Sequence, residues 1–130
     1  MRDLREIVVH ATLESNEKDL REMDLKHRRD GWFGCGYHYL IRKDGKVEMG
    51  RPIEQPGAHA EDFNKYSVGV CVLNNGEFTK RQWASLAATI ASIVKVYPDI
   101  KVIGHRDCSK RSTKCPGFNV GAWWNKQLKD

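Results

Sequence analysis

The sequence lacks the features that mark membrane and secreted proteins. No apolar run approaches the roughly eighteen residues that a membrane-spanning helix requires. Residues 1–6 contain no apolar core of a signal peptide, so we expect synthesis in the cytoplasm, where thiols stay reduced. Of the four cysteines, we interpret Cys35 and Cys71 as buried strand residues with free thiols. Repeats, linkers and low-complexity segments are also absent, which favours a single domain over residues 1–130.

The charge of the chain is basic but scattered. A formal net charge of +5 favours a polyanionic partner, such as nucleic acid, anionic lipid or an acidic cell-wall polymer. The alternative is that the charge only keeps the protein soluble. Because the sequence has neither a clustered basic stripe nor a platform of aromatic residues for stacking bases, we expect no nucleic-acid partner.

Short β-branched segments alternate with segments of helical periodicity. Residues 80–96 place apolar side chains at helical spacing after Thr79, a good N-cap residue. The sequence Lys43-Asp44-Gly45-Lys46 is typical of a hairpin turn. This order predicts a single α/β domain in which helices flank a mixed central β-sheet. The predicted strands are 7–9, 37–41, 47–49, 67–73 and 100–103, and the predicted helices are 17–29 (capped by Ser15 or Asn16), 80–96 and a short one around Trp123 and Trp124.

Two of the predicted strands end at a histidine. His10 follows the first strand, and His105 follows the last strand and Gly104. If these strands are parallel, both histidines lie at the same carboxyl edge of the sheet, where α/β proteins bind ligands. Cys115 follows ten residues after His105. Imidazole and thiolate suit zinc, so we expect His10, His105 and Cys115 to hold one Zn²⁺ with a fourth position open to water. The alternative is a capped strand and an incidental cysteine.

Three further residues are candidates for chemistry beside that metal. Tyr37 begins a predicted strand, and its phenol there would donate a hydrogen bond to a developing oxyanion; the alternative is a core aromatic residue. Thr113 lies two residues before Cys115, where its hydroxyl would orient water or the leaving group. Lys114, like Lys110, is a candidate cation for a substrate carboxylate, and the alternative is a solvated lysine.

The remaining histidines call for different interpretations. His59 lies in the long loop 52–64 between glycine and alanine neighbours. It is a candidate to contact substrate or to support a metal ligand, and the alternative is simple exposure. His38 alternates with Tyr37 and is expected to point the other way, buried and hydrogen-bonded. His27 lies in a highly charged predicted helix and is expected at the surface.

Seven short motifs follow one another between Ile7 and Trp124. They are Val8-Val9-His10-Ala11-Thr12, Gly36-Tyr37-His38-Tyr39, Asp44-Gly45-Lys46-Val47-Glu48 with Gly50-Arg51, Gly57-Ala58-His59-Ala60, Ser67-Val68-Gly69-Val70, Gly104-His105-Arg106-Asp107 and Thr113-Lys114-Cys115-Pro116-Gly117. In this order they resemble the zinc N-acetylmuramoyl-L-alanine amidases of the phage lysozyme-amidase and peptidoglycan recognition protein type. The resemblance covers nearly the whole chain.

The resemblance implies a mixed central sheet with packed helices and a zinc ion held by His10, His105 and Cys115. The implied substrate is the amide that joins the lactyl group of N-acetylmuramic acid to L-alanine of the peptidoglycan stem peptide. Zinc-bound water would attack that carbonyl, and Tyr37 would help stabilise the tetrahedral oxyanion. Some phage members have lysine where this chain has Thr113, so the second polar helper here is a hydroxyl group.

The chain departs from the family pattern at two places. Ala11 follows the first ligand where the family often has cysteine or serine, which should leave ligation unaffected. The loop from His105 to Cys115 is longer than in the compact phage enzymes, so the positions of Lys110 and Arg111 stay open. A catalytic domain of this size suits a phage or prophage endolysin that acts on the cell wall after release.

Two other functions remain as alternatives at this stage. One is a module that binds muropeptide without cleaving it, and the presence of Cys115 favours the enzyme over this reading. The other is regulation of a phage RNA polymerase, which no feature of the sequence demands. We expect a monomer whose partner is peptidoglycan.

Overall fold

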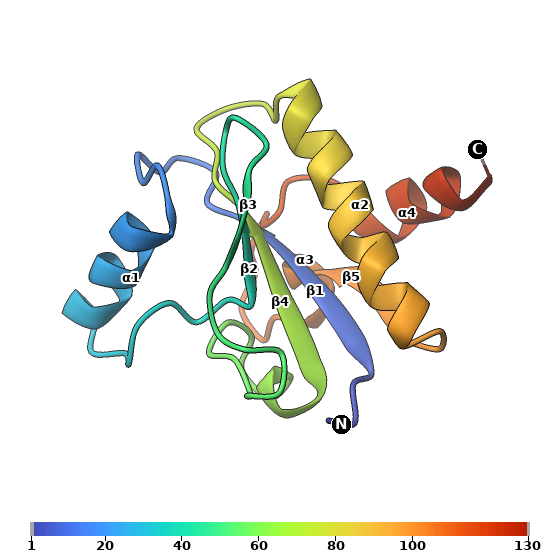
Figure 1. Cartoon of the computed structure of the whole chain (residues 1–130), viewed down its shortest axis with the longest axis horizontal. Coiled ribbons are helices and arrows are strands. Elements are labelled where there is room, and N and C mark those ends of the chain that lie inside the picture. The colour runs from blue at the N-terminus through green and yellow to red at the C-terminus, as the bar shows by residue number, and fades with distance from the viewer. Residues whose placement is uncertain (1, 130) are drawn as a thin grey trace.

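Five strands form one sheet in the computed structural model, which describes residues 2–129 (Figure 1). They are β1 (Glu6–Ala11), β2 (Tyr39–Ile41), β3 (Val47–Met49), β4 (Ser67–Val72) and β5 (Lys101–Gly104). Their order across the sheet is β3-β2-β4-β1-β5. All neighbouring pairs are parallel except β2 and β3, which are antiparallel. The hairpin thus makes the sheet mixed, and the predicted fold class is confirmed.

The two central strands are buried almost from end to end. Every residue of β4 is buried, and only Glu6 of β1 is partly exposed. Strands covered on both faces have continuous apolar sequences because neither side chain direction meets water. The parallel register pairs Val9 of β1 with Gly104 of β5, so both strands run out at the same edge of the sheet.

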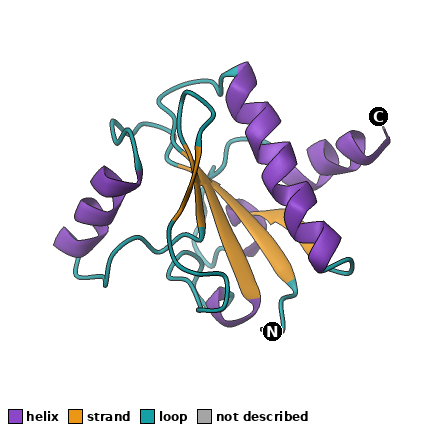
Figure 2. Ribbon diagram, in the orientation of Figure 1, coloured by secondary structure: helices purple, strands orange, loops and turns teal. Residues whose placement is uncertain are grey.

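Helices cover both faces of the sheet. They are α1 (Leu20–Arg29), the 3₁₀ turn η1 (Asn64–Tyr66), α2 (Lys80–Val96), the single turn α3 (His105–Cys108) and α4 (Val120–Lys129). The helix α1 lies on one side of the sheet, and α2 and α4 lie on the other (Figures 1 and 2). Leu86 and Ile90 of α2 are 0% exposed, and burial of each such side chain stabilises the fold by about 1.5–3 kcal/mol.

The two long helices begin at side-chain caps. Thr79 and Gln82 form a capping box at the start of α2, as the sequence predicts. The helix α1 begins later than predicted, at residue 20 rather than 17, so the expected cap at Ser15 or Asn16 is wrong. Asp19 is the cap, because its carboxylate accepts the backbone N–H of Glu22 at 2.9 Å.

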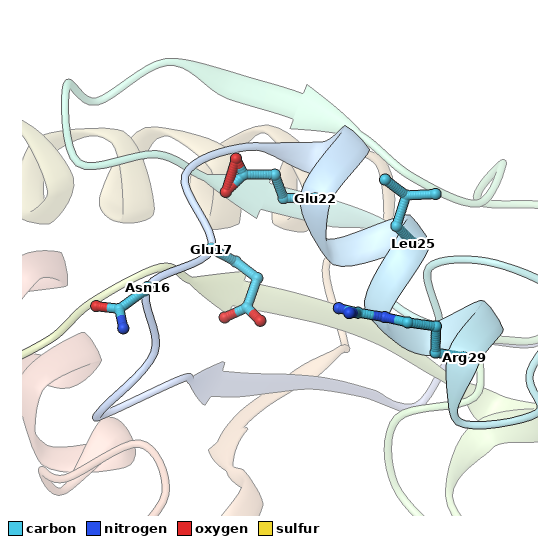
Figure 3. A pocket seen from close by; sticks show the side chains of 5 residues that line it. All are labelled: Asn16, Glu17, Glu22, Leu25 and Arg29. Atoms are coloured by element: carbon cyan, nitrogen blue, oxygen red, sulfur yellow. The ribbon is translucent and has the colours of Figure 1, made fainter.

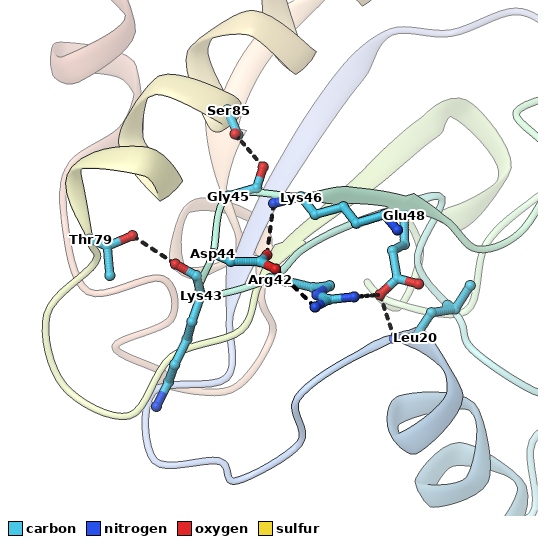
Figure 4. Close-up of polar contacts among 9 residues, drawn as sticks. All are labelled: Leu20, Arg42, Lys43, Asp44, Gly45, Lys46, Glu48, Thr79 and Ser85. Carbon is cyan, nitrogen blue, oxygen red and sulfur yellow. Dashed lines mark hydrogen bonds and ion pairs between the residues drawn. The ribbon is translucent and has the colours of Figure 1, made fainter.

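The β2–β3 hairpin forms hydrogen bonds with α2 on one side of the sheet and with α1 on the other (Figure 4). Ser85 of α2 donates its hydroxyl to the carbonyl of Gly45 in the turn at 2.5 Å. Gly45 has φ of +86°, and a Cβ there would lie 2.8 Å from Cβ of Arg81, so the turn requires glycine. Across the sheet, the Glu48 carboxylate accepts the backbone N–H of Leu20 at 3.1 Å. The hairpin therefore fixes the start of α1 relative to α2.

Arg2 holds the long loop between β3 and β4 against the body. Its guanidinium donates four hydrogen bonds of 2.9 Å to loop carbonyls, those of Ile53, Gln55, Asn64 and Lys65. The Asn64 side chain in turn accepts the backbone N–H groups of His59 and Ala60, both at 2.9 Å. These contacts give the loop one conformation and set the position of His59.

His27 is buried, and its predicted surface position is wrong. The side chain is 5% exposed, and its Nδ1 accepts the backbone N–H of Gly36 at 3.0 Å. Its ring packs against Trp32, with centroids 4.5 Å apart. The prediction failed because the charged neighbours of His27 face solvent while the loop after α1 folds back over the histidine. His38 is 1% exposed and hydrogen-bonded, as predicted.

Several boundaries differ from the sequence-based prediction. The strand β2 begins at Tyr39, so Tyr37 precedes the strand, and Cys35 is buried in a loop instead of a strand. The single turn α3 directly after β5 was not predicted. All four cysteines are free thiols. Among the described helices, none is long and apolar enough to cross a membrane.

The Arg2 contacts generate a prediction about stability. Arg2→Ala should lower the free energy of unfolding by about 2 kcal/mol, because four carbonyl groups lose a charged donor that water replaces only in part. Urea unfolding measures this change, and hydrogen exchange should accelerate in residues 53–65. Arg29→Ala, at an exposed position on α1, is the matched control and should change stability by less than about 0.5 kcal/mol. Equal stabilities for the two variants would contradict a stabilising role of the Arg2 hydrogen bonds.

Candidate metal centre

Three side chains converge at the carboxyl edge of β1 and β5. His10 is the penultimate residue of β1, His105 is the first residue after β5, and Cys115 lies in the loop between α3 and α4. One ligand atom of each residue lies within 4.8 Å of those of the other two. The imidazole rings of His10 and His105 have centroids 4.5 Å apart. The fold therefore brings together the three residues that the sequence singles out.

Backbone contacts hold Cys115 at the end of β1. Its Sγ lies 3.3 Å from the backbone nitrogen of Ala11, which donates to it, and 3.5 Å from the carbonyl oxygen of the same residue. The backbone N–H of Arg106 donates to the Cys115 carbonyl at 2.8 Å, which joins this loop to α3. Burial raises the pKa of the Cys115 thiol, and the Ala11 N–H opposes that shift.

The histidines of the cluster are neutral. Burial lowers the pKa of His10 well below its ordinary value, and the neighbouring His59 and His105 lower it further. Burial also lowers the pKa of His105. A neutral imidazole keeps a lone pair on one ring nitrogen, which is the form that ligates metals. Two neutral imidazoles and a thiol whose ligand atoms lie within 4.8 Å of one another are thus a donor set for a divalent cation such as zinc.

Tyr37 borders the same cluster. Its ring centroid lies 5.1 Å from that of His10. Burial raises the pKa of Tyr37 well above its ordinary value, and the nearby thiols of Cys71 and Cys115 add to this shift. The phenol therefore stays protonated at neutral pH and is a hydrogen-bond donor.

A cleft of about 650 Å³ opens over the cluster. Its lining includes His10, Tyr37, His105, Thr113 and Cys115. A second hollow of about 530 Å³ adjoins the cleft, because both are lined by Trp32, His59 and His105. The ligand atoms thus face an open space large enough for a substrate segment.

A further hollow lies between α1 and the preceding loop (Figure 3). It is lined by Asn16, Glu17, Glu22, Leu25 and Arg29, none of which is a histidine or a cysteine. Asn16 and Glu17 also line the cleft over the cluster. We therefore assign this hollow to the rim of that cleft.

The comparison with protein families decides the identity. Residues 1–118 match the family model described as N-acetylmuramoyl-L-alanine amidase. The chain belongs to this amidase family. It is 32% identical to an endolysin of Klebsiella phage KP32 over 93% of this chain and 85% of that protein. It is 33% identical to an endolysin of Enterobacteria phage T3 over 92% of this chain and 85% of that protein.

Solved structures give the same answer for the fold of the amidase. The N-acetylmuramoyl-L-alanine amidase LysC from Clostridium intestinale superimposes with a TM-score of 0.88 at 32% identity, covering 98% of this chain and 87% of that one. Drosophila peptidoglycan recognition protein SD superimposes with a TM-score of 0.80 at 28% identity, covering 95% and 80%. The predicted resemblance is confirmed, and the protein is a peptidoglycan hydrolase of the amidase class.

Thr113 and the two candidate lysines differ in whether they line the cleft over the metal cluster. Thr113 is half-buried in the cleft wall, and its hydroxyl accepts the backbone N–H of Cys115 at 3.2 Å. Lys114 is exposed and lines none of the hollows described above. Lys110 lies at the second hollow, 2.5 Å from the carboxylate of Asp62. The roles of Thr113 and Lys114 stay predictions.

His59 lies deeper than a substrate-binding residue of a loop would. It is 8% exposed and hydrogen-bonded to His10, with 2.9 Å between His59 Nδ1 and His10 Nε2. Burial, followed by the effects of His38 and His105, lowers the pKa of His59 to about 3. Of the interpretations that the sequence allows for His59, support of a metal ligand fits this position best.

Sequence reasoning missed two residues that contribute to the site. Trp32 is 43% exposed and lines both hollows, where it forms the wall between α1 and the cluster. Its signal in the sequence is an aromatic pair between Gly31 and Gly34, both of which have positive φ. Ser67 is fully buried at the start of β4 and lies 3.2 Å from His59 Nε2. Nothing in a sequence distinguishes it from an ordinary strand serine.

Proposed function

We propose that this amidase uses one zinc ion, held by His10, His105 and Cys115, to cleave the bond between N-acetylmuramic acid and L-alanine of the stem peptide. The observation that carries the proposal is the convergence of these three ligand atoms within 4.8 Å at the base of a cleft. Family membership supports the choice of bond, because the matching family is named for that activity.

The donor set fits zinc in a catalytic site. Zinc prefers imidazole and thiolate ligands, and catalytic sites keep one position free of protein. Among residues 2–129, the cluster contains no fourth histidine, cysteine or carboxylate within the same reach. His59 contacts His10 through Nδ1 and Ser67 through Nε2, so neither of its nitrogens is left for the metal.

The residues around the metal divide the chemistry of amide hydrolysis among them. When bound there, zinc would supply Lewis acidity for the attack of water on the amide carbonyl. The phenol of Tyr37 donates a hydrogen bond to the oxyanion that develops on the substrate carbonyl. Thr113 presents a hydroxyl that orients the attacking water or the leaving amine. The C–N bond breaks and the amide nitrogen departs as an amine once it has taken up the proton that the attacking water releases. Lys114 presents an exposed cation for a carboxylate of the stem peptide, and His59 supports the metal ligand His10.

The similarity to phage endolysins supports a role in host lysis. We infer that the protein is made inside the host cell and acts on the cell wall after release, as a monomer. A non-catalytic module that only binds muropeptide is disfavoured by the intact ligand set, since binding alone needs no metal. No feature of the described residues favours contact with an RNA polymerase.

The first prediction concerns the thiol ligand. Cys115→Ser should reduce bound zinc from one per chain to nearly none, because a hydroxyl is a much weaker zinc ligand than a thiolate. Release of stem peptides from purified cell wall should fall by more than the roughly 10–100-fold that loss of a partner outside the ligand set causes. Cys108→Ser, which changes a half-buried thiol outside the ligand set, is the matched control and should keep both. Activity that survives both chelation and Cys115→Ser would rule out the metal mechanism.

The second prediction concerns the phenol. Tyr37→Phe should keep one zinc per chain but lower kcat by about a hundredfold to a thousandfold, or ~2.7–4 kcal/mol, because one oxyanion donor is lost. Tyr39→Phe removes the hydroxyl of a half-buried tyrosine on β2 and should leave kcat unchanged. Turnover by Tyr37→Phe at the wild-type rate would remove Tyr37 from the mechanism.

A further inference from the structure

A series of hydrogen bonds runs from the candidate metal cluster to the start of the central strand β4. His10 Nε2 lies 2.9 Å from His59 Nδ1, and His59 Nε2 lies 3.2 Å from the hydroxyl of Ser67. All three side chains are buried. The three residues come from β1, from the loop after β3 and from the start of β4, so this chain of contacts exists only in the folded protein.

The ring of His59 fits into a slot made by two glycines. A Cβ on Gly69 of β4 would lie 2.6 Å from Cγ of His59, and a Cβ on Gly57 would lie 2.5 Å from its Cδ2. Real Cβ atoms do not approach other atoms so closely, so both positions require glycine while the ring stays where it is. The backbone N–H of His59 is also fixed, by Asn64. The ring therefore has one position, with one nitrogen toward each of its two partners.

Metal binding would fix which residue donates and which accepts in each of these hydrogen bonds. A ligating imidazole needs a lone pair toward the metal, and His10 Nε2 is already engaged with His59, so Nδ1 is the nitrogen left for the metal. His10 then carries its hydrogen on Nε2 and donates it to His59 Nδ1. His59 in turn carries its hydrogen on Nε2 and donates it to Ser67. The opposite direction would put hydrogen on His10 Nδ1 and block ligation.

We propose that His59 and Ser67 are positioning residues that fix the tautomer and the ring orientation of His10 for metal binding. The proposal rests on the proposed function, in which His10 is a zinc ligand. It assigns His59 a role other than substrate contact, because both of its nitrogens are engaged inside the protein. Second partners of this kind orient metal-bound histidines and raise their basicity.

Zinc affinity of the purified protein, measured by competition with a chromogenic chelator, tests the proposal without reference to turnover. His59→Leu fills the slot but accepts no hydrogen bond, and it should weaken zinc binding by about 10–100-fold. His59→Asn places an amide oxygen near the position of Nδ1 and should recover a large part of that loss. His38→Leu is the matched control, because His38 is a buried histidine beside His59 that makes no hydrogen bond to His10, His59 or Ser67, and it should keep zinc affinity within about twofold.

A spectroscopic readout separates orientation from simple packing. In the zinc-loaded wild type, nitrogen NMR of the His10 ring should show hydrogen on Nε2, in slow exchange because the ring is buried. In His59→Leu that signal should broaden or shift while the backbone spectrum stays native. Ser67→Ala, a smaller change that serves if His59→Leu fails to fold, should weaken zinc binding by a few-fold and alter the same signal.

The outcomes separate this inference from the proposed function. If the wild type binds no zinc, the proposed function fails. If the wild type binds zinc and either folded variant, His59→Leu or Ser67→Ala, keeps wild-type affinity and the wild-type His10 signal, only the positioning role is overturned. Equal losses in His59→Leu, His59→Asn and His38→Leu would also overturn it, since they would show an effect of packing alone.

Discussion

Parallel pairing of β1 with β5 is the constraint on which the rest of the site depends. The two strands are far apart in the sequence, yet their register sets Val9 beside Gly104, so His10 and His105 emerge one residue later at the same edge. Antiparallel pairing would send the two imidazoles to opposite edges of the sheet. Cys115 completes the set because its loop returns across the end of β1, where the backbone of Ala11 contacts its sulfur. Strand direction thus places the residues of the candidate metal cluster together.

Burial then decides the chemical state of the groups that meet there. Removing imidazole and phenol side chains from water disfavours their charged forms, which leaves the histidines neutral and Tyr37 protonated. The same burial would be costly for polar groups without partners, but no described buried side-chain nitrogen or oxygen lacks a hydrogen bond. His59 is the clearest case, because its partners are His10 on one side and Ser67 on the other. The buried polar groups around the candidate metal cluster therefore have hydrogen-bond partners inside the protein.

Loops carry several of the side chains around the metal cluster, and contacts far from the cleft hold two of those loops in place. The loop that carries His59 has no regular secondary structure before η1, but Arg2 binds four of its carbonyls. The β2–β3 hairpin likewise holds the start of α1, because Glu48 accepts the backbone N–H of Leu20. The loop after α1 brings Trp32 to the cleft wall. A rigid sheet with pinned loops keeps donors in place before substrate arrives, which is what stabilisation of a transition state requires.

The sequence by itself determined the fold class, the five strands, the cap of α2 and the three residues that meet in the candidate metal cluster, because apolar periodicity and strand-end histidines are local signals. It did not reveal that His27 is buried, that Asp19 caps α1, or that Ser67 and Gly69 lie against His59. Those facts depend on how segments distant in the sequence pack against one another. A charged neighbourhood conceals a buried histidine, and a strand serine carries no mark of its partner, until the tertiary structure places them in contact.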